Sequence, residues 1–170
     1  MRLSLWYPAD DISGSDDFDR FVKSFKLVPI SYREASTTFS DPRGISFTPP
    51  ARWVRETPKG PFQAARFSNL TRSIVLLVSG NAGYTCRNFR AEVQSTGRLV
   101  EEAQIKLANQ VFTKLMTYED VPKYNVRLTN AQYCMDTRNG AIALVGTVEK
   151  DMYWRWASVF EGTAATLRAR

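Results

Sequence analysis

The chain of 170 residues has the length of one domain, and its 44% apolar residues suffice for a core of its own. Its charged fraction of 24% is ordinary for a globular protein, which excludes collagen-like and wholly disordered chains. The longest apolar runs have five residues, far below the roughly 20 that a membrane-spanning helix needs.

The sequence lacks histidine, the commonest general base and metal ligand in proteins. Its two cysteines, Cys86 and Cys134, are too few for a zinc-ligand pattern. They have two interpretations: one disulfide in an oxidising compartment, or two buried thiols. The sequence contains no phosphate-binding glycine loop and no Ser-His-Asp set. We therefore expect neither an enzyme nor a directly bound metal or cofactor.

The net charge of +6 lies almost entirely in the middle third of the chain. Residues 41–98 hold nine Lys and Arg against three Asp and Glu. Eight of these nine bases are arginine, whose guanidinium pairs with carboxylate or phosphate through two hydrogen bonds. We expect a surface that docks on an acidic partner; the alternative is a solvated basic face without a partner. The basic residues expected to bind the partner are Arg43, Arg52, Arg55, Lys59, Arg87 and Arg90.

Residues 1–41 are predicted to form an N-terminal arm with one short helix, followed by a domain over residues 42–170. Three phenylalanines recur at helical spacing within residues 16–26. Such a stripe covers either the core of its own domain or a partner. Because aromatic residues dominate interface hot spots, we expect the arm to support association. The expected aromatic anchors are Trp6, Phe18, Phe21 and Phe25.

From residue 44 the pattern changes to strands, which are either alternating or uniformly apolar. Residues 79–97 are expected to form a long connection. The dipeptide Asn139-Gly140 predicts a tight hairpin between the strands at residues 126–136 and 141–148. The predicted strands are residues 45–47, 63–67, 73–79, 126–136 and 141–148.

A long amphipathic helix is predicted over residues 98–117, because apolar residues recur there every four positions. Residues 151–170 fit either a helical face or an aromatic strand with a turn at residues 161–162, and we favour the strand. The predicted fold class is α+β, with a largely antiparallel sheet covered by the long helix and preceded by the arm.

A run of glycine, alternating strand, prolines, a basic residue and tryptophan stands at residues 44–53, with the sequence GISFTPPARW. The strands QAARF at 63–67 and IVLLV at 74–78 follow it. This succession resembles the opening of a PsbP-family domain. The family continues with a loop and an amphipathic helix, to which residues 99–116 correspond. The terminal segments 139–145 and 153–156 also resemble the family.

The resemblance implies an α-β-α sandwich that is non-catalytic and lies in the thylakoid lumen, peripheral to the membrane. It implies docking on a photosystem, either the oxygen-evolving side of photosystem II or photosystem I, which the subunit stabilises or helps to assemble. An indirect role in calcium and chloride retention belongs to the same implication. Metal-binding histidines of some members have no counterpart in this sequence, so no metal site is carried over.

Two alternatives from other classes remain open. A nucleic-acid-binding or viral structural module would use the same arginines on phosphates. A small-molecule-binding α+β domain would enclose an apolar pocket between its helix and its sheet.

Overall fold

The computed structural model describes residues 37–59, 63–69, 74–79, 83–96 and 98–169, and of residues 74–79 only the backbone. All of these residues belong to the unit formed by residues 32–170. None of the helices within these ranges is long and apolar enough to cross a membrane. The predicted arm helix and the anchors Trp6, Phe18, Phe21 and Phe25 lie outside the described residues.

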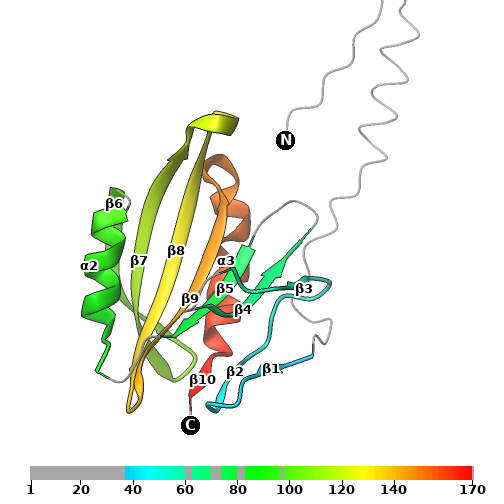
Figure 1. The fold of residues 1–170 in the computed structure, drawn as a ribbon, viewed down its shortest axis with the longest axis vertical. Helices are drawn as coiled ribbons and strands as arrows, with labels where there is room; N and C mark the ends of the chain where they lie inside the picture. Colours follow the sequence, from blue (N-terminus) through cyan, green and yellow to red (C-terminus); the bar gives the residue numbers. More distant parts are fainter. Residues whose placement is uncertain (1–36, 60–62, 70–73, 80–82, 97, 170) are drawn as a thin grey trace, which may run out of the picture. The chain divides into compact units, whose positions relative to one another are not determined.

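Two antiparallel sheets form the body of the fold (Figure 1). The strands of the large sheet are β3 (Val54–Glu56), β4 (Gln63–Ser68), β5 (Ile74–Ser79), β6 (Arg98–Leu107), β7 (Gln110–Val121), β8 (Val126–Thr137) and β9 (Gly140–Glu149). Their spatial order is β3-β4-β5-β9-β8-β7-β6, so β3 and β6 are its two edges. The small sheet has the order β1 (Phe39–Ser40), β2 (Ile45–Phe47) and β10 (Arg168–Ala169). The strands predicted between residues 45 and 79 and the Asn-Gly hairpin are thereby confirmed.

The two described α-helices cover opposite faces of the large sheet. These are α2 (Cys86–Thr96) and α3 (Tyr153–Ala165), and two short 3-10 helices, η1 (Pro122–Tyr124) and η2 (Lys150–Met152), lie at the ends of strands. Tyr133 belongs to the core cluster under α3, and the next residue, Cys134, to the cluster under α2. Because successive side chains of a strand point to opposite faces, the two helices lie on opposite sides of the sheet.

The α3 helix packs its apolar face against the main core cluster. Its residues Trp156, Val159 and Phe160 are buried against the sheet. Gly146 on β9 lies directly beneath the ring of Phe160, and a Cβ atom at Gly146 would lie only 2.6 Å from the Phe160 Cδ1. The absence of a side chain at Gly146 therefore sets how closely α3 approaches the sheet.

A half-buried lysine connects α3 to the β6–β7 hairpin. The Lys114 ammonium lies 3.1 Å from Glu101 Oε1 on β6 and 3.6 Å from Glu161 Oε1 on α3, and its side chain is 12% exposed. Burial opposes the charge of Lys114, but the hydrogen bond to Glu101 and the negative groups around it raise the pKa of the amine. The lysine therefore stays charged and holds the two elements together.

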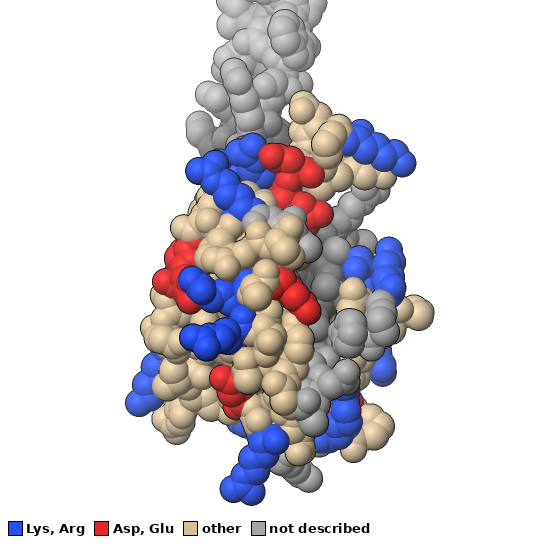
Figure 2. All heavy atoms as spheres, turned by 60° about the vertical axis from the view of Figure 1, so that its left-hand side comes forward, with Lys and Arg blue, Asp and Glu red and all other residues tan. Residues whose placement is uncertain are grey.

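The α2 helix rests on a smaller apolar cluster on the other face. Phe89 and Val93 are its buried aromatic and aliphatic residues, and the small side chains of Ala141 and Ala143 lie beneath it. Basic and acidic side chains are interspersed on the side of the molecule that carries α2 (Figure 2). This side of the fold therefore has no single sign of charge.

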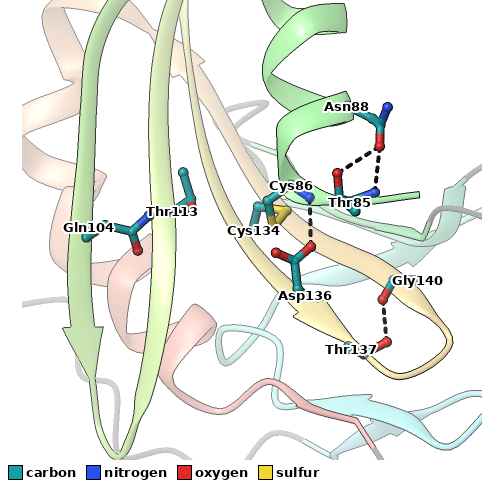
Figure 3. Close-up of a disulfide and its surroundings, with 9 residues drawn as sticks. All are labelled: Thr85, Cys86, Asn88, Gln104, Thr113, Cys134, Asp136, Thr137 and Gly140. Carbon is teal, nitrogen blue, oxygen red and sulfur yellow. Dashed lines mark hydrogen bonds between the residues drawn. A yellow bond between two sulfur atoms is a disulfide. The ribbon is translucent and has the colours of Figure 1, made fainter. Parts of the chain in front are cut away.

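The first residue of α2 is covalently attached to the sheet. Cys86 and Cys134 form a disulfide, with their Cα atoms 5.7 Å apart (Figure 3). The Cys86 N–H donates a hydrogen bond of 2.8 Å to Asp136 Oδ1, and the Asn88 side-chain oxygen accepts bonds from both the N–H and the hydroxyl of Thr85. These contacts satisfy backbone donors that a helix start leaves unpaired.

The helix predicted over residues 98–117 is wrong, because this segment forms the β6–β7 hairpin. Positions four apart along a strand also share a face, so the spacing of Leu99, Ala103 and Leu107 fits both structures. The turn consists of Ala108 and Asn109, and Ala108 adopts φ 53° without the glycine that normally marks such a turn. The tight turn was therefore not visible in the sequence.

Two further expectations are corrected by helices. Residues 79–97 are not only a connection, since α2 occupies their second half. The strand favoured within residues 151–170 is a helix, α3, followed by the short strand β10. Burial of Trp156, Val159 and Phe160 at helical spacing against the sheet outweighs the strand preference of the aromatic residues.

The disulfide has a direct chemical test. We expect the denatured, unreduced chain to show no thiol that reacts with a titrating reagent, because the structure has no free cysteine. In the chain-entropy model a bridge across 48 residues contributes about 4 kcal/mol to the free energy of unfolding. Cys134→Ala should lower that free energy by a similar amount. Two reactive thiols in the untreated protein would contradict the bridge.

Candidate docking surface

The connection into β3 is fixed by tryptophan packing at one edge of the large sheet. The Trp53 ring meets the Trp156 ring of α3 edge-to-face, with centroids 5.6 Å apart. The Trp53 N–H donates to the Pro50 carbonyl at 3.3 Å, which closes a turn at this point. Arg52, between these two residues, adopts φ 64° and is exposed. The anchored tryptophan thus places an arginine at the surface.

The strand β3 itself presents both apolar and basic side chains to solvent. Val54 is 63% exposed, and Arg55 is exposed as well. The Arg55 guanidinium lies 5.0 Å from the centroid of the Phe39 ring, a cation–π contact that orients the arginine without neutralising it. Lys59 follows on the next loop, where its backbone N–H donates to Gln63 Oε1 at 3.0 Å.

The single acidic residue of this stretch, Glu56, already has a cationic partner outside it. Its carboxylate accepts a hydrogen bond from the Ser68 hydroxyl and another, of 2.5 Å, from Arg66 Nε; the bond from Ser68 and, after it, the bond from Arg66 lower the pKa of Glu56. The charges of Glu56 and Arg66 therefore offset each other. Residues 52–59 hold three bases besides this acid, so this stretch of the sequence has more basic than acidic residues. We call Arg52, Arg55 and Lys59 the β3 surface.

The other predicted basic residues lie elsewhere. Arg43 is in the β1–β2 turn, where its guanidinium pairs with Asp41 at 2.7 Å. Arg87 is exposed on α2, and Arg90 on the same helix pairs with Glu102 at 2.8 Å. Because α2 contacts β6 to β9 and β3 is the opposite sheet edge, the six residues do not form one basic surface. The other half of the set, Arg52, Arg55 and Lys59, lies on β3 or within three residues of it in the chain.

Sequence reasoning missed a second surface feature, at the other end of β7 and β8. A cavity of about 530 Å³ lies between this hairpin end and η2, lined among others by Asp120, Arg127 and Glu149. Tyr124 and Trp154, on η1 and α3, are exposed by 64% and 71%. Asp120 and Arg127 pair at 2.5 Å, so the cavity shows no excess of one charge comparable to that of the β3 surface. The only signal in the sequence was the aromatic composition of residues 153–156.

No metal site is assembled among the described residues, since their Cys, Asp and Glu side chains form no group of three or more that could hold an ion. The cavity beside the β3 surface has a volume of about 320 Å³ and is lined by Arg55, Glu56, Thr57 and Pro58.

The fold is similar to solved structures. The chain resembles the solution structure of cyanobacterial PsbP (CyanoP) from Synechocystis sp. PCC 6803, with a TM-score of 0.59 and 16% identity, covering 85% of this chain and 99% of that one. It also resembles a crystal structure from Bacteroides thetaiotaomicron VPI-5482, with a TM-score of 0.57 and 22% identity. That match covers 81% of this chain and 49% of the other, so this chain spans about half its length.

No protein-family model and no curated protein sequence matches the chain. The structural likeness defines the class: a mixed α/β fold with antiparallel sheets and two described helices, similar to that of PsbP. The predicted fold class is thereby confirmed, with its helices at other positions than expected.

The lowered pKa of Glu56 predicts that the stability of the fold depends on pH. A carboxyl group whose pKa is lowered below its usual 4.5 stabilises the fold above that pH, and this contribution is lost as the pH falls through the lowered pKa. We expect Glu56→Gln to lower the thermal unfolding midpoint at about pH 7, and the difference from wild type to shrink below about pH 4. Thermal melts over a pH series measure this.

The matched control is Glu149→Gln, because Glu149 forms no ion pair among the described residues and is exposed. Its midpoint should follow the wild type at every pH. A Glu56→Gln deficit that stays constant down to about pH 3 would contradict a Glu56 carboxylate stabilised by Ser68 and Arg66.

Proposed function

We propose that this protein is a non-catalytic docking subunit, peripheral to a membrane-associated photosynthetic complex, which it binds through the β3 surface. The acidic partner is recognised by Arg52, Arg55 and Lys59. The observation that carries the proposal is the local charge excess. The only acid of the stretch, Glu56, is already paired with Arg66.

The likeness to cyanobacterial PsbP supports the photosynthetic setting, since it covers 85% of the chain. The resemblance of residues 44–53 to the opening of a PsbP-family domain also supports a photosynthetic setting. These residues lead directly into β3. Trp53, the last residue of that run, holds the connection against α3. The best-matched sequence motif and the charged surface therefore lie next to each other.

The disulfide supports an oxidising compartment as the site of function, because such bonds are rare in reducing ones. A lumenal location agrees with this requirement. There the arginines of the β3 surface would meet carboxylates of other lumen-facing proteins.

Two features argue against the other two functional classes: the lining of the cavities and the chemistry required of the partner. Three cavities lined by described residues all include charged side chains, which favours a polar contact over an enclosed apolar ligand. Nucleic-acid binding would use the same arginines, but it needs phosphate rather than carboxylate on the partner.

The proposal predicts the effect of charge reversal on membrane attachment. Cyanobacterial thylakoid membranes, washed with salt to remove peripheral proteins, are mixed with the purified chain, and the bound fraction is measured by cosedimentation. We expect Arg52→Glu, Arg55→Glu and Lys59→Glu together to weaken binding about tenfold or more. Single exposed pairs contribute only about 0.2–1 kcal/mol each, so the joint change is needed. The unfolding midpoint should change little.

The matched control reverses the same number of charges elsewhere, at the exposed residues Arg98, Lys123 and Arg138. This control should bind like the wild type. Equal loss in both triple variants would show attraction by net charge alone and would contradict a specific β3 surface. Binding to random oligonucleotides that exceeds membrane binding, and is lost in the β3 variant, would favour the nucleic-acid alternative.

A further inference from the structure

The strand β6 is the second edge of the large sheet, and it is long. Its ten residues have a neighbouring strand on one side only within the part of the chain that the structure describes. An edge strand offers a row of unpaired N–H and C=O groups to any strand that can lie beside it. The three-residue edge strand β3 offers few of these groups, whereas the ten-residue strand β6 offers enough of them for another strand to pair along it.

The turn of the β6–β7 hairpin decides which backbone groups face outward. A two-residue loop joins Leu107 and Gln110, so these flanking residues form a hydrogen-bonded pair. Hydrogen-bonded and non-bonded pairs alternate along an antiparallel ladder. Ala103 and Ile105 therefore also direct their N–H and C=O groups toward β7. The outward N–H and C=O groups belong to the even-numbered residues Glu102, Gln104 and Lys106.

The side chains of these three residues are complementary in charge to those of a second, antiparallel copy of the same strand. Glu102 and Lys106 carry opposite charges at equal distances from Gln104, and all three are exposed. In an antiparallel pairing of two β6 strands centred on Gln104, each Glu102 would lie opposite the Lys106 of the other copy. The same pairing brings the outward backbone groups of all three residues into hydrogen-bonded pairs.

Other registers lose this complementarity. A register centred on residue 103 places Glu102 opposite Gln104 and Lys106 opposite Val100. One centred on residue 102 places two Glu102 carboxylates opposite each other, and like charges in that position are destabilising. The ladder between β6 and β7 also shifts register between Leu99 and Glu101, so the regular pairing runs only from Glu101 to Leu107. The regular part of β6 is thus the self-complementary part.

We propose that β6 pairs antiparallel with β6 of a second copy of this chain, about a two-fold axis at Gln104. The pairing would join the two seven-stranded sheets into one continuous sheet. It does not rest on the proposed function, because β3 lies at the opposite edge and stays accessible in the pair.

The helix packed on this part of the sheet leaves room for the second copy. At the level of Gln104 and Thr113, α2 lies over Cys134 on β8, two strands away from the edge (Figure 3). Farther along, α2 reaches β6 through the ion pair of Arg90 with Glu102. The Glu102 side chain remains 40% exposed, so its carboxylate can accept a second cation. Lys106 has no ion pair among the described residues.

A charge-swap experiment on the full chain tests the pairing. Sedimentation equilibrium of the wild type over a concentration series should show a monomer–dimer equilibrium. Lys106→Glu places two pairs of carboxylates in contact, and Glu102→Lys places two pairs of ammonium groups in contact. Each single variant should dimerise about tenfold more weakly or worse, because two attractions become two repulsions.

Mixing the two single variants should restore association as a heterodimer. In the Lys106→Glu chain both charged positions of β6 are acidic, and in the Glu102→Lys chain both are basic. The proposed pairing therefore places two acidic side chains of one strand opposite two basic side chains of the other.

The control is Lys123→Glu, an equal charge change at the η1 hairpin end, which should dimerise like the wild type. A wild type that stays monomeric to its solubility limit would overturn the proposal. So would a dimer that persists unchanged in both single variants, or single variants whose mixture fails to associate. Thermal melts of each variant establish that a lost dimer is not a lost fold.

Discussion

The contact of Phe160 with Gly146 is the constraint on which the rest of the fold depends. The ring lies where a β-carbon would otherwise be, so α3 approaches β9 more closely than a side chain on the strand would allow. From this contact the helix extends in two directions. Trp156 fixes the connection into β3, and the Thr166 hydroxyl accepts a hydrogen bond of 2.8 Å from the Thr48 N–H beside β2. One helix thereby couples the small sheet to the large one.

The two edges of the large sheet, β3 and β6, differ in length and in the charges they expose. The β3 edge is short, follows two buried prolines and carries a local excess of positive charge, which suits a partner of opposite sign. The β6 edge is long, and its exposed Glu102 and Lys106 lie on either side of Gln104, as the proposed pairing with a second copy requires. The central strands β5, β9 and β8 lie between these edges and have a neighbouring strand on each side. They therefore have no free edge to pair with another strand.

Much of the sheet could be predicted from local patterns. The Asn139-Gly140 turn and the alternation of residues 45–47 are signals that lie within a few residues of each other. The β6–β7 hairpin was missed for an equally local reason: a four-residue repeat is a multiple of the strand period, and Ala108 gives no turn signal. The α3 helix was missed because its stability comes from burial against the sheet, which an aromatic-rich segment does not reveal by itself. In the candidate site, too, contacts between residues close in the sequence can be predicted, whereas contacts between distant elements cannot. The pairing of Arg43 with Asp41 spans two residues, whereas that of Arg90 with Glu102 depends on α2 crossing β6 and could not be anticipated.

The most direct test of this account is the free energy of unfolding of Gly146→Ala, measured by denaturant titration. A methyl group at this position must displace the buried ring of Phe160, and overpacking of this kind costs about 1–3 kcal/mol. We therefore predict a loss of stability within that range. A variant as stable as the wild type would show that α3 does not depend on the glycine, and would contradict the central role of this contact.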